Sequence, residues 1–367
     1  MRIICDGLTL ADAVLKVSKA LPQKTSNPVL DGLKLVAKDE TLTLFATDLN
    51  FSIEKTIPAT VITPGELIIP GRLFTEFTRK LASEQQIEIL VNEEKQIILK
   101  YTDSQSVFQC LDNAEYPNFN KPNKEKGFLV GEEELKDIIN KVIFSAATED
   151  SRPILKGVLF EVDDYTLTAV CLDGYRLAQC KKPLIKQSEK MSAVVPARIL
   201  AEIAKLLEDG DNIATIYLDK NMMYVDLSHT KISTSLLSGE YINYKQILPQ
   251  QFVTSITANR EQFINALDRA SIISRNEKRN FVTLEIKENL LVLTANSEVG
   301  NIKESITISL WGKDIIISLT THYLSDCLKV IPNEFIKIQF NTSVTPCIVT
   351  PCETDEYLYL ILPIRMN

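Results

Sequence analysis

The sequence is poor in the residues that build metal centres and disulfide frameworks. It holds two histidines and seven cysteines, and it contains neither a CxxC pair nor an HExxH signature. An odd cysteine count without paired spacing fits no disulfide framework and no zinc module, so we interpret the cysteines as small, reduced core residues. We therefore expect neither a metal site nor a cofactor.

Long apolar runs are absent as well. No run reaches the roughly 18 residues that a membrane-spanning helix needs. The first residues, MRIICDGLTLADAV, are interrupted by Asp6 and Asp12 and lack the small-residue cleavage site of a secretory signal. With 45% hydrophobic and 24% charged residues over 367 positions, the composition is that of a soluble globular protein with room for two or three domains. We expect a cytoplasmic location and no membrane partner.

The motifs of common enzyme classes are missing too. The chain has no GxGxxG, no GxxxxGKS/T and no GxSxG. One enzymatic alternative stays open, a hydrolase or nuclease site around Asp150, Arg152, Asp173 and Arg176. Asp followed by Gly is more often a turn between strands, and no partner for acid and base chemistry can be placed. We expect a protein that is not an enzyme.

What the sequence does contain is a repeat as long as a domain. TLTLFATDL at 41–49 returns as TLTAVCLDG at 166–174. The match widens to 28–49 against 153–174, with a weaker third copy at 280–299. Each copy consists of two apolar strands joined by a short polar turn, the pattern of a β-hairpin. The chain is therefore expected to be one domain present three times.

Two helices accompany each hairpin. Amphipathic segments precede the hairpins at 8–21, 132–146 and 260–273. A strand leading into a second helix follows them at 67–81, 193–207 and 316–331, with Pro70 and Pro196 at two of the strand-to-helix transitions. The pattern predicts an α+β fold with antiparallel sheets and three domains, 1–120, 128–246 and 247–367. Proline-rich and polar linkers are expected near 118–129 and 243–256, short enough to keep the neighbours packed together.

Cations recur at matching places in the copies although the chain is acidic, with a net charge of −8. The first helices share Lys16, Lys141 and Arg269, and the second helices share Arg72, Arg198 and His322, then Arg79, Lys205 and Lys329. On the wheel of the helix at 71–82, Arg72 and Arg79 lie opposite an apolar face of Leu73, Phe74, Phe77 and Leu81. Such residues could be ordinary solvated helix faces, but their recurrence favours a track that holds phosphates without reading bases.

The C-terminus, EYLYLILPIRMN, stays apolar to within one position of its end. Free termini are normally polar and frayed. The pattern indicates either a strand inside a sheet or the wall of a groove that accepts a peptide.

From end to end, the chain resembles the bacterial DNA polymerase III β subunit family, the sliding clamps. The resemblance rests on TDLNFSIE (47–54), IIPGRLFTEFTRKL (68–81), ATEDSRPILKGVLFE (147–161), DGYRLA (173–178), VVPARILAEIAKLL (194–207), RASIISRNEKRNFVTLEI (269–286) and the terminal LPIRM. It implies a head-to-tail homodimer that closes into a ring, lines its hole with helices, encircles double-stranded DNA without sequence specificity and confers processivity on the replicative polymerase.

The resemblance also implies three sets of site residues. The DNA-facing set is Lys16, Lys24, Arg72, Arg79, Lys141, Arg198, Lys205, Arg269 and Lys329. A cleft for short linear motifs of the polymerase, the clamp loader and repair proteins would be walled by Leu155, Leu172, Gly174, Tyr175, Arg176, Leu177, Ile242, Gln246, Ile247, Val344, Pro346, Leu360, Leu362, Pro363, Ile364, Arg365 and Met366. The dimer interface would use Phe108, Ile272, Ile273, Glu298 and Glu304.

Several positions depart from the family pattern. Leu172, Ile242 and Gln246 replace the commoner Thr, Pro and Arg, and Leu362 and Ile364 replace methionines, so the motif preference of the cleft is expected to differ. Asp103 and Gln105 stand where basic partners of the interface glutamates are expected, which predicts a weaker dimer. A monomeric peptide-binding scaffold that never closes is the remaining alternative.

Overall fold

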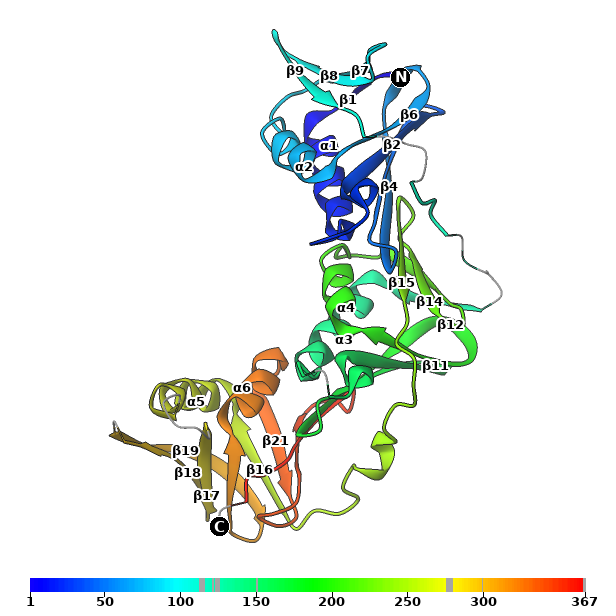
Figure 1. Ribbon diagram of the computed structural model, residues 1–367. Coiled ribbons are helices and arrows are strands. Elements are labelled where there is room, and N and C mark those ends of the chain that lie inside the picture. Colours follow the sequence, from blue (N-terminus) through cyan, green and yellow to red (C-terminus); the bar gives the residue numbers. More distant parts are fainter. Residues whose placement is uncertain are drawn as a thin grey trace. The chain divides into compact units, whose positions relative to one another are not determined.

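Two compact units make up the structure (Figure 1). It is a computed structural model, and the residues it describes are 1–111, 116–120, 122, 126–149, 151–274, 280–298 and 300–365. Unit 1 comprises Met1–Glu133 with Lys205–Leu236, and unit 2 comprises Glu134–Ala204 with Leu237–Asn367. Strands of the predicted middle domain occur in both units, and the three domain boundaries stay predictions.

Unit 1 contains two antiparallel sheets. The strands of the first are β1 (Arg2–Cys5), β5 (Thr60–Thr63), β7 (Ile87–Val91), β8 (Gln96–Tyr101) and β9 (Ser104–Gln109), in the order β5-β1-β7-β8-β9. The strands of the second are β2 (Gly32–Lys38), β3 (Thr41–Thr47), β4 (Phe51–Pro58), β6 (Gly65–Pro70), β10 (Gly127–Gly131), β13 (Ile213–Leu218), β14 (Met222–Asp226) and β15 (Thr230–Ser235), in the order β10-β13-β14-β15-β4-β3-β2-β6.

The eight-stranded sheet joins strands of the first and second repeats. β4 pairs with β15, and Ile53 lies opposite Ile232 in the core. Helices α1 (Gly7–Val17) and α2 (Gly71–Thr78) pack against each other, and α1 lies on β3 and β4. The short linkers predicted that neighbouring repeats pack together. Here the first and second repeats share a sheet and are joined by the backbone hydrogen bonds between β4 and β15.

Unit 2 is built on one ten-stranded antiparallel sheet. Its strands are β11 (Gly157–Leu172), β12 (Arg176–Pro196), β16 (Thr254–Asn259), β17 (Phe281–Lys287), β18 (Leu290–Ser297), β19 (Gly300–Gly312), β20 (Ile315–Thr320), β21 (Phe335–Phe340), β22 (Cys347–Pro351) and β23 (Tyr357–Ile361). Their order is β11-β12-β23-β22-β21-β16-β19-β18-β17-β20. The pairing of β12 with β23 joins the second repeat to the third.

The helices of unit 2 are α4 (Ala197–Ala204), α5 (Arg260–Ser274), α6 (Thr321–Val330) and all but the first two residues of α3 (Glu132–Val142). Helices α5 and α6 pack against each other, and α5 lies on β18. All six predicted helices are present in the described residues, and α2 and α4 each begin directly after a proline that ends a strand. None of the helices in the described ranges has the length and apolarity of a membrane span.

The repeat is visible in the backbone as well as in the sequence. The predicted hairpins at 28–49 and 280–299 are the pairs β2–β3 and β17–β18. Asp39, Asp164 and Glu288 occupy the same point of the three copies, and each has a positive φ, of 50°, 55° and 53°. This left-handed conformation is uncommon for residues other than glycine. In the second copy β11 is a single strand whose register shifts around Asp164.

The C-terminal segment is a strand inside a sheet, which confirms one of its two interpretations. β23 lies between β12 and β22, and Tyr359 and Ile361 on it are buried. Beyond it, Leu362 N donates to Tyr175 O at 2.9 Å and Ile364 N donates to Ser318 O at 2.8 Å. These hydrogen bonds hold the tail against two other segments of unit 2, at Tyr175 and Ser318.

One part of the helical-wheel prediction was wrong. Leu73, assigned to the apolar face of α2, is 52% exposed. The helix is only eight residues long, and its buried side is formed by Gly71, Phe74 and Thr78, which recur at helical spacing. Leu73 is one position away from this stripe and therefore projects outward.

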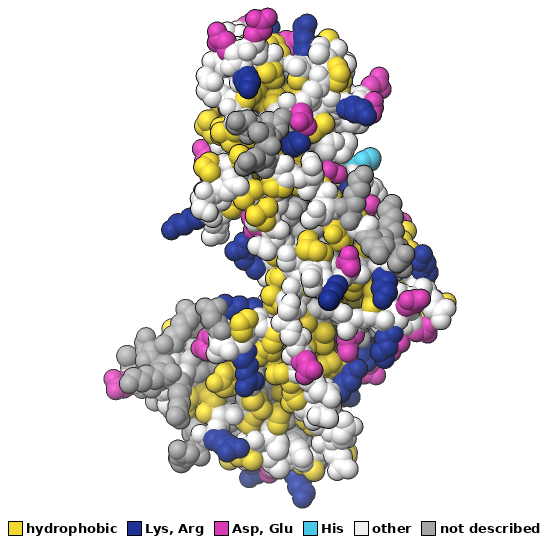
Figure 2. Space-filling view, turned by 45° about the vertical axis from the view of Figure 1, so that its right-hand side comes forward, with side chains coloured by type: hydrophobic (Ala, Val, Ile, Leu, Met, Phe, Trp, Pro, Cys, Tyr) yellow, Lys and Arg dark blue, Asp and Glu magenta, His cyan; other side chains and the backbone are white. Residues whose placement is uncertain are grey.

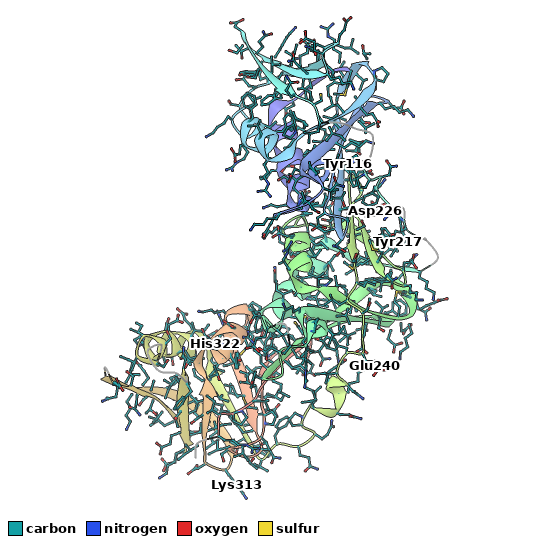
Figure 3. All side chains as sticks on the ribbon, viewed as in Figure 1. Tyr116, Tyr217, Asp226, Glu240, Lys313 and His322 are labelled. Atoms are coloured by element: carbon teal, nitrogen blue, oxygen red, sulfur yellow. The ribbon has the colours of Figure 1, made fainter. Side chains whose placement is uncertain are left out.

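Tyr116, which is labelled in Figure 3, lies two residues before the first predicted linker and holds the chain in unit 1. Its ring packs edge-on against Phe45, with centroids 5.8 Å apart, and its hydroxyl donates to Gly32 O at 2.8 Å. The buried phenol therefore fixes the point at which the chain leaves the first repeat.

Candidate functional site: recurring cations and an apolar cluster

The recurring cations occupy the same helical positions in all three copies. Lys16, Lys141 and Arg269 are each the tenth residue of α1, α3 and α5. Arg72, Arg198 and His322 are each the second residue of α2, α4 and α6. The equivalence that was predicted from the aligned repeats is confirmed by the helix starts.

The cations of the first helices are ion-paired. Lys16 Nζ lies 3.1 Å from Asp12 Oδ2 on the preceding helical turn. Arg269 donates two hydrogen bonds to the carboxylate of Glu304, at 2.7 and 2.8 Å. These pairs hold the side chains in place and reduce the positive field that they present. Glu304, expected to seek a cation across a dimer interface, already has one in its own chain.

Lys141 departs from the prediction that the recurring cations point to solvent. It is only 6% exposed, its Nζ lies 2.7 Å from Asp137 Oδ2, and it sits 4.3 Å from the centre of the Tyr357 ring. Lys182 shares the same carboxylate at 2.8 Å. Burial raises the pKa of Asp137, but hydrogen bonds from the two lysines outweigh it, so the pKa lies below its ordinary value. Lys141 is therefore part of a packed ion cluster.

The cations of the second helices are more accessible. Arg79, Arg198, Lys205 and Lys329 are exposed, and the Lys329 ammonium lies 3.5 Å from Asp268. The exposed Arg72 donates to Pro22 O at 2.6 Å and to Gln23 O at 2.7 Å, next to the exposed Lys24. Arg72 thereby positions the segment that carries Lys24.

The third copy has His322 where the others have arginine (Figure 3). Its ring packs against Tyr323, with centroids 4.3 Å apart. Burial and the nearby Arg176 hold the pKa of His322 below its ordinary value of 6.5, which favours the neutral ring. Near neutral pH the third copy therefore lacks the charge that Arg72 and Arg198 supply.

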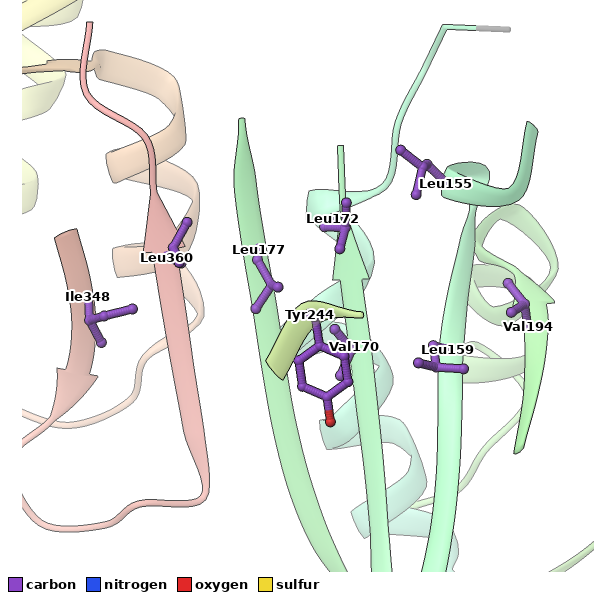
Figure 4. Close-up of a cluster of buried hydrophobic side chains, with 9 residues drawn as sticks. All are labelled: Leu155, Leu159, Val170, Leu172, Leu177, Val194, Tyr244, Ile348 and Leu360. Carbon is purple, nitrogen blue, oxygen red and sulfur yellow. The ribbon is translucent and has the colours of Figure 1, made fainter. Parts of the chain in front are cut away.

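An apolar cluster in unit 2 brings together part of the predicted cleft. Leu155, Leu172, Leu177 and Leu360 are buried in it (Figure 4). Ile242 packs on it. They come from the short helix η4 (Pro153–Lys156), from β11, β12 and β23, and from the segment after β15. Pairing of Leu172 with Leu177 and of Leu177 with Leu360 places three of them in one row across the sheet.

The cluster has five further buried members that the sequence prediction missed, namely Leu159, Val170, Val194, Tyr244 and Ile348. Alternation from Leu172 along β11 would have identified Val170, because every second residue of a strand shares a face. Tyr244 has no such signal. It belongs to the short helix η5 (Tyr244–Gln246), within a segment predicted as a linker.

Other predicted wall residues lie outside the buried cluster. Gly174, Tyr175, Gln246, Ile247, Val344 and Arg365 are exposed, and Pro346, Leu362, Pro363 and Ile364 are half-buried. Met366 lies outside the described residues. Hydrophobic side chains are also exposed together on the face of unit 2 seen in Figure 2.

Asp173 and Arg176 hold the turn between β11 and β12 together. Asp173 Oδ1 accepts hydrogen bonds from Tyr175 N at 2.8 Å and Arg176 N at 3.0 Å, and Gly174 has a φ of 97°. This confirms the turn expected from Asp-Gly. Arg176 binds Asp173 Oδ2 at 3.1 Å and Asp326 Oδ2 at 2.6 Å, donates to Phe144 O, and lies over the Tyr323 ring.

The proposed hydrolase residues do not form a site in the described part of the chain. Arg176 and Asp173 bind each other in the turn, Arg152 is exposed, and Asp150 lies outside the described residues. Over the described ranges, no group of three or more His, Cys, Asp or Glu side chains is placed to hold a metal ion.

The residues predicted for a dimer interface are partly accessible. Ile272 is 65% exposed and Glu298 is exposed. Ile273 and Phe108 are half-buried, and the Phe108 ring packs against Phe77 with centroids 5.0 Å apart. β9, which carries Phe108, is an edge strand of its sheet and so offers unpaired backbone groups.

Comparison with known proteins covers almost the whole chain. Residues 1–120, 130–243 and 245–365 match the family models of the N-terminal, central and C-terminal domains of the DNA polymerase III beta subunit. The beta sliding clamp of Halalkalibacterium halodurans is 31% identical with full coverage of both chains, and that of Bacillus subtilis is 28% identical over 97% of each.

Solved structures give the same result. The crystal structure of the DNA polymerase sliding clamp from Bacillus subtilis has a TM-score of 0.96 at 28% identity, with 100% of both chains covered. A sliding clamp from Pseudomonas aeruginosa, bound to griselimycin, has a TM-score of 0.94 at 25% identity over the same share.

Proposed function

Because the chain belongs to the family of the DNA polymerase III beta subunit, the sliding clamps, we propose that two copies close head to tail into a ring around duplex DNA. Its function is that of a sliding clamp, a non-catalytic factor that makes a DNA polymerase processive. A closed ring cannot leave a duplex sideways, while phosphate contacts exchange easily as it slides. Retention then comes from topology, and we place this activity in the cytoplasm. The hydrolase alternative is set aside.

The observation that carries the DNA-binding proposal is the repetition of cations at fixed helical positions in an acidic chain. We propose that Arg79, Arg198 and Lys205, which are exposed, contact phosphates, together with Lys24 on its segment and Lys329. Such contacts carry no base readout, which suits a ring that must move along any sequence. Lys16 and Arg269 belong to this set with their charge partly offset by their ion pairs. Lys141 leaves the set because it is buried.

The ring would close through an edge strand and an apolar contact. β9 with Phe108 would meet the segment of the second copy that carries Ile272, Ile273 and Glu298. Two chains of three domain-sized repeats would place six repeats head to tail. Each contact between the chains would join two different surfaces, and such contacts form a ring when the rotation from one copy to the next returns to the first copy. The intrachain pair of Arg269 with Glu304 leaves less charge for the interface, which supports a dimer held mainly by apolar and backbone contacts.

The apolar cluster of unit 2 would anchor partner proteins. We propose that the replicative polymerase, the clamp loader and repair proteins dock short apolar motifs on its accessible border, formed by Ile247, Val344 and the tail at Leu362 and Ile364. The buried row Leu172, Leu177 and Leu360 forms the floor. Apolar side chains of a partner suit this lining, because removing their surface from water contributes to the affinity.

The test of the ring combines mass and topology. Light scattering should give about twice the chain mass of 41.3 kDa. Protein loaded on nicked circular DNA by a clamp loader should remain on it through gel filtration, and it should be lost when a restriction enzyme opens the circle. A monomer that binds apolar peptides would favour the scaffold alternative. Binding that is indifferent to DNA ends would refute the ring.

A further inference from the structure

The sheet face that carries the apolar cluster continues into a polar pocket that the proposed docking does not use. The pocket has a volume of about 840 Å³ and is lined by residues of β11, β12 and β23 and by the segment around Tyr244. Tyr244, Leu248 and Leu358 belong both to the pocket lining and to the cluster or its border. The two features are therefore neighbours within unit 2.

Strand register shows how the cluster leads into the pocket. Along β12, Leu177, Gln179 and Lys181 share one face, because they are two residues apart. Leu177 lies in the cluster, whereas Gln179 and Lys181 line the pocket. On β11 the same face runs from Leu172 to Thr168, which pairs with Lys181. One continuous surface therefore changes from apolar to polar over about 13 Å, the length of four extended residues.

Tyr244 stands at the junction. Figure 4 shows its ring beside Val170 and Leu177, with the hydroxyl directed along the strands away from Leu172. The hydroxyl donates to Glu161 Oε2 at 2.7 Å, and Lys245 Nζ lies 3.5 Å from the same oxygen. Hence the carboxylate of Glu161 already has a donor and a cation within the pocket.

Two polar groups of the pocket have no partner among the described residues. Gln179 is only 6% exposed, and its Oε1 is buried without a hydrogen-bond donor. The ammonium of Lys181 has no carboxylate within ion-pair distance in the described part of the chain, whereas Lys190 is 3.1 Å from Asp163. A buried acceptor without a donor is unfavourable, so a water molecule or a ligand group is expected to supply the missing hydrogen bond.

We propose that this pocket is a second docking subsite, which binds an acidic residue flanking the apolar motif of a partner peptide. The peptide carboxylate pairs with Lys181, and the Gln179 side chain turns its amide oxygen into the pocket to accept a peptide N–H. An extended peptide anchored over Leu177 reaches Lys181 after about four residues. The inference rests on the proposed docking of partners at the apolar cluster and adds a charge preference to it.

The test compares synthetic peptides on the purified full-length protein. The anchor is a fluorescein-labelled pentapeptide with two leucines and a phenylalanine. Four longer peptides carry a spacer of three serines at either the N-terminal or the C-terminal end of the anchor, with glutamate or glutamine at the far end of the spacer. Their dissociation constants are measured by fluorescence anisotropy. At one of the two ends, glutamate should bind about fivefold more tightly than glutamine, as expected for a partly exposed charge-assisted pair. The preference should shrink in 1 M salt.

Three variants assign the preference to the pocket. Lys181→Glu should abolish or invert the ratio between the glutamate and glutamine peptides, and Gln179→Leu should reduce it without destabilising the fold, because a buried acceptor that lacks a donor is removed. Lys186→Glu, an equal charge change at an exposed position of β12 outside the pocket, should keep the ratio.

Equal affinity of the glutamate and glutamine peptides for the wild type would overturn the subsite while leaving anchor binding intact. An unchanged ratio in Lys181→Glu would also overturn it. If the anchor alone fails to bind, the proposed docking at the cluster fails, and the subsite fails with it. The glutamate and glutamine peptides therefore test the subsite, and the anchor peptide alone tests the docking at the cluster.

Discussion

Reversing two exposed cations should change how DNA affinity depends on salt. Arg79 follows α2 and Arg198 is the second residue of α4, and both are exposed without an ion pair among the described residues. If each contacts one phosphate, a ring of two copies of Arg79→Glu with Arg198→Glu loses four contacts. Each contact contributes about 0.9 to the slope of log affinity against log salt, so the slope should become shallower by about 3 to 4.

The assay is anisotropy of a labelled 30-base-pair duplex, titrated at salt concentrations between 50 and 200 mM. Over this range the wild type should lose about 100-fold more affinity than the double variant. Lys186→Glu with Lys220→Glu is the matched control, because it changes the charge equally at exposed positions away from the helices. The melting temperatures of both variants should stay close to that of the wild type, since surface changes of this kind are nearly neutral. Equal slopes in the double variant and its control would refute the argument from recurring cations.

Three further predictions concern unit 2. Arg176→Met removes the partner of Asp173 and Asp326 and should lower the free energy of unfolding by about 2 to 4 kcal/mol in urea titrations; a loss under 1 kcal/mol would contradict its assigned role. Leu177→Ala should lower stability by about 2 to 4 kcal/mol and weaken the leucine and phenylalanine pentapeptide at least tenfold, whereas Leu73→Ala, at an exposed leucine, should do neither. His322 has a folded-state pKa below its unfolded value, so the unfolded chain binds more protons and stability rises with pH through that window. His322→Gln should therefore flatten the rise in unfolding free energy between pH 5 and pH 7, and an unchanged rise would show that other groups cause it.

The helices and the repeat could be read from the sequence because their signals are local. Apolar residues at helical spacing predicted α5, and the prolines before α2 and α4 marked where strands end and helices begin. Cations at the tenth and second helical positions required only an alignment of the copies. The sequence did not predict the positive φ of Asp39, Asp164 and Glu288, although the three residues occupy equivalent positions in the repeat.

The predicted cleft rests on the family resemblance, and only some of its residues belong to the buried cluster. Leu172, Leu177 and Leu360 meet because β23 pairs with β12, and Leu177 and Leu360 are about 180 positions apart in the sequence. Tyr244 enters the cluster from a segment whose composition predicts only a linker. Sequence spacing carries no information on which distant strands become neighbours.

The sequence by itself determined three copies of one α+β unit, cations at fixed helical positions, and a C-terminal strand, since each depends on the order of neighbouring residues. Only the tertiary structure decided that Lys141 is buried between Asp137 and Tyr357, that Arg176 cross-links a turn to α6, and that Gln179 and Lys181 extend an apolar surface into a polar pocket. The physical reason is that burial and the pairing of charges are set by what other segments place beside a side chain, and those segments lie far away in the sequence.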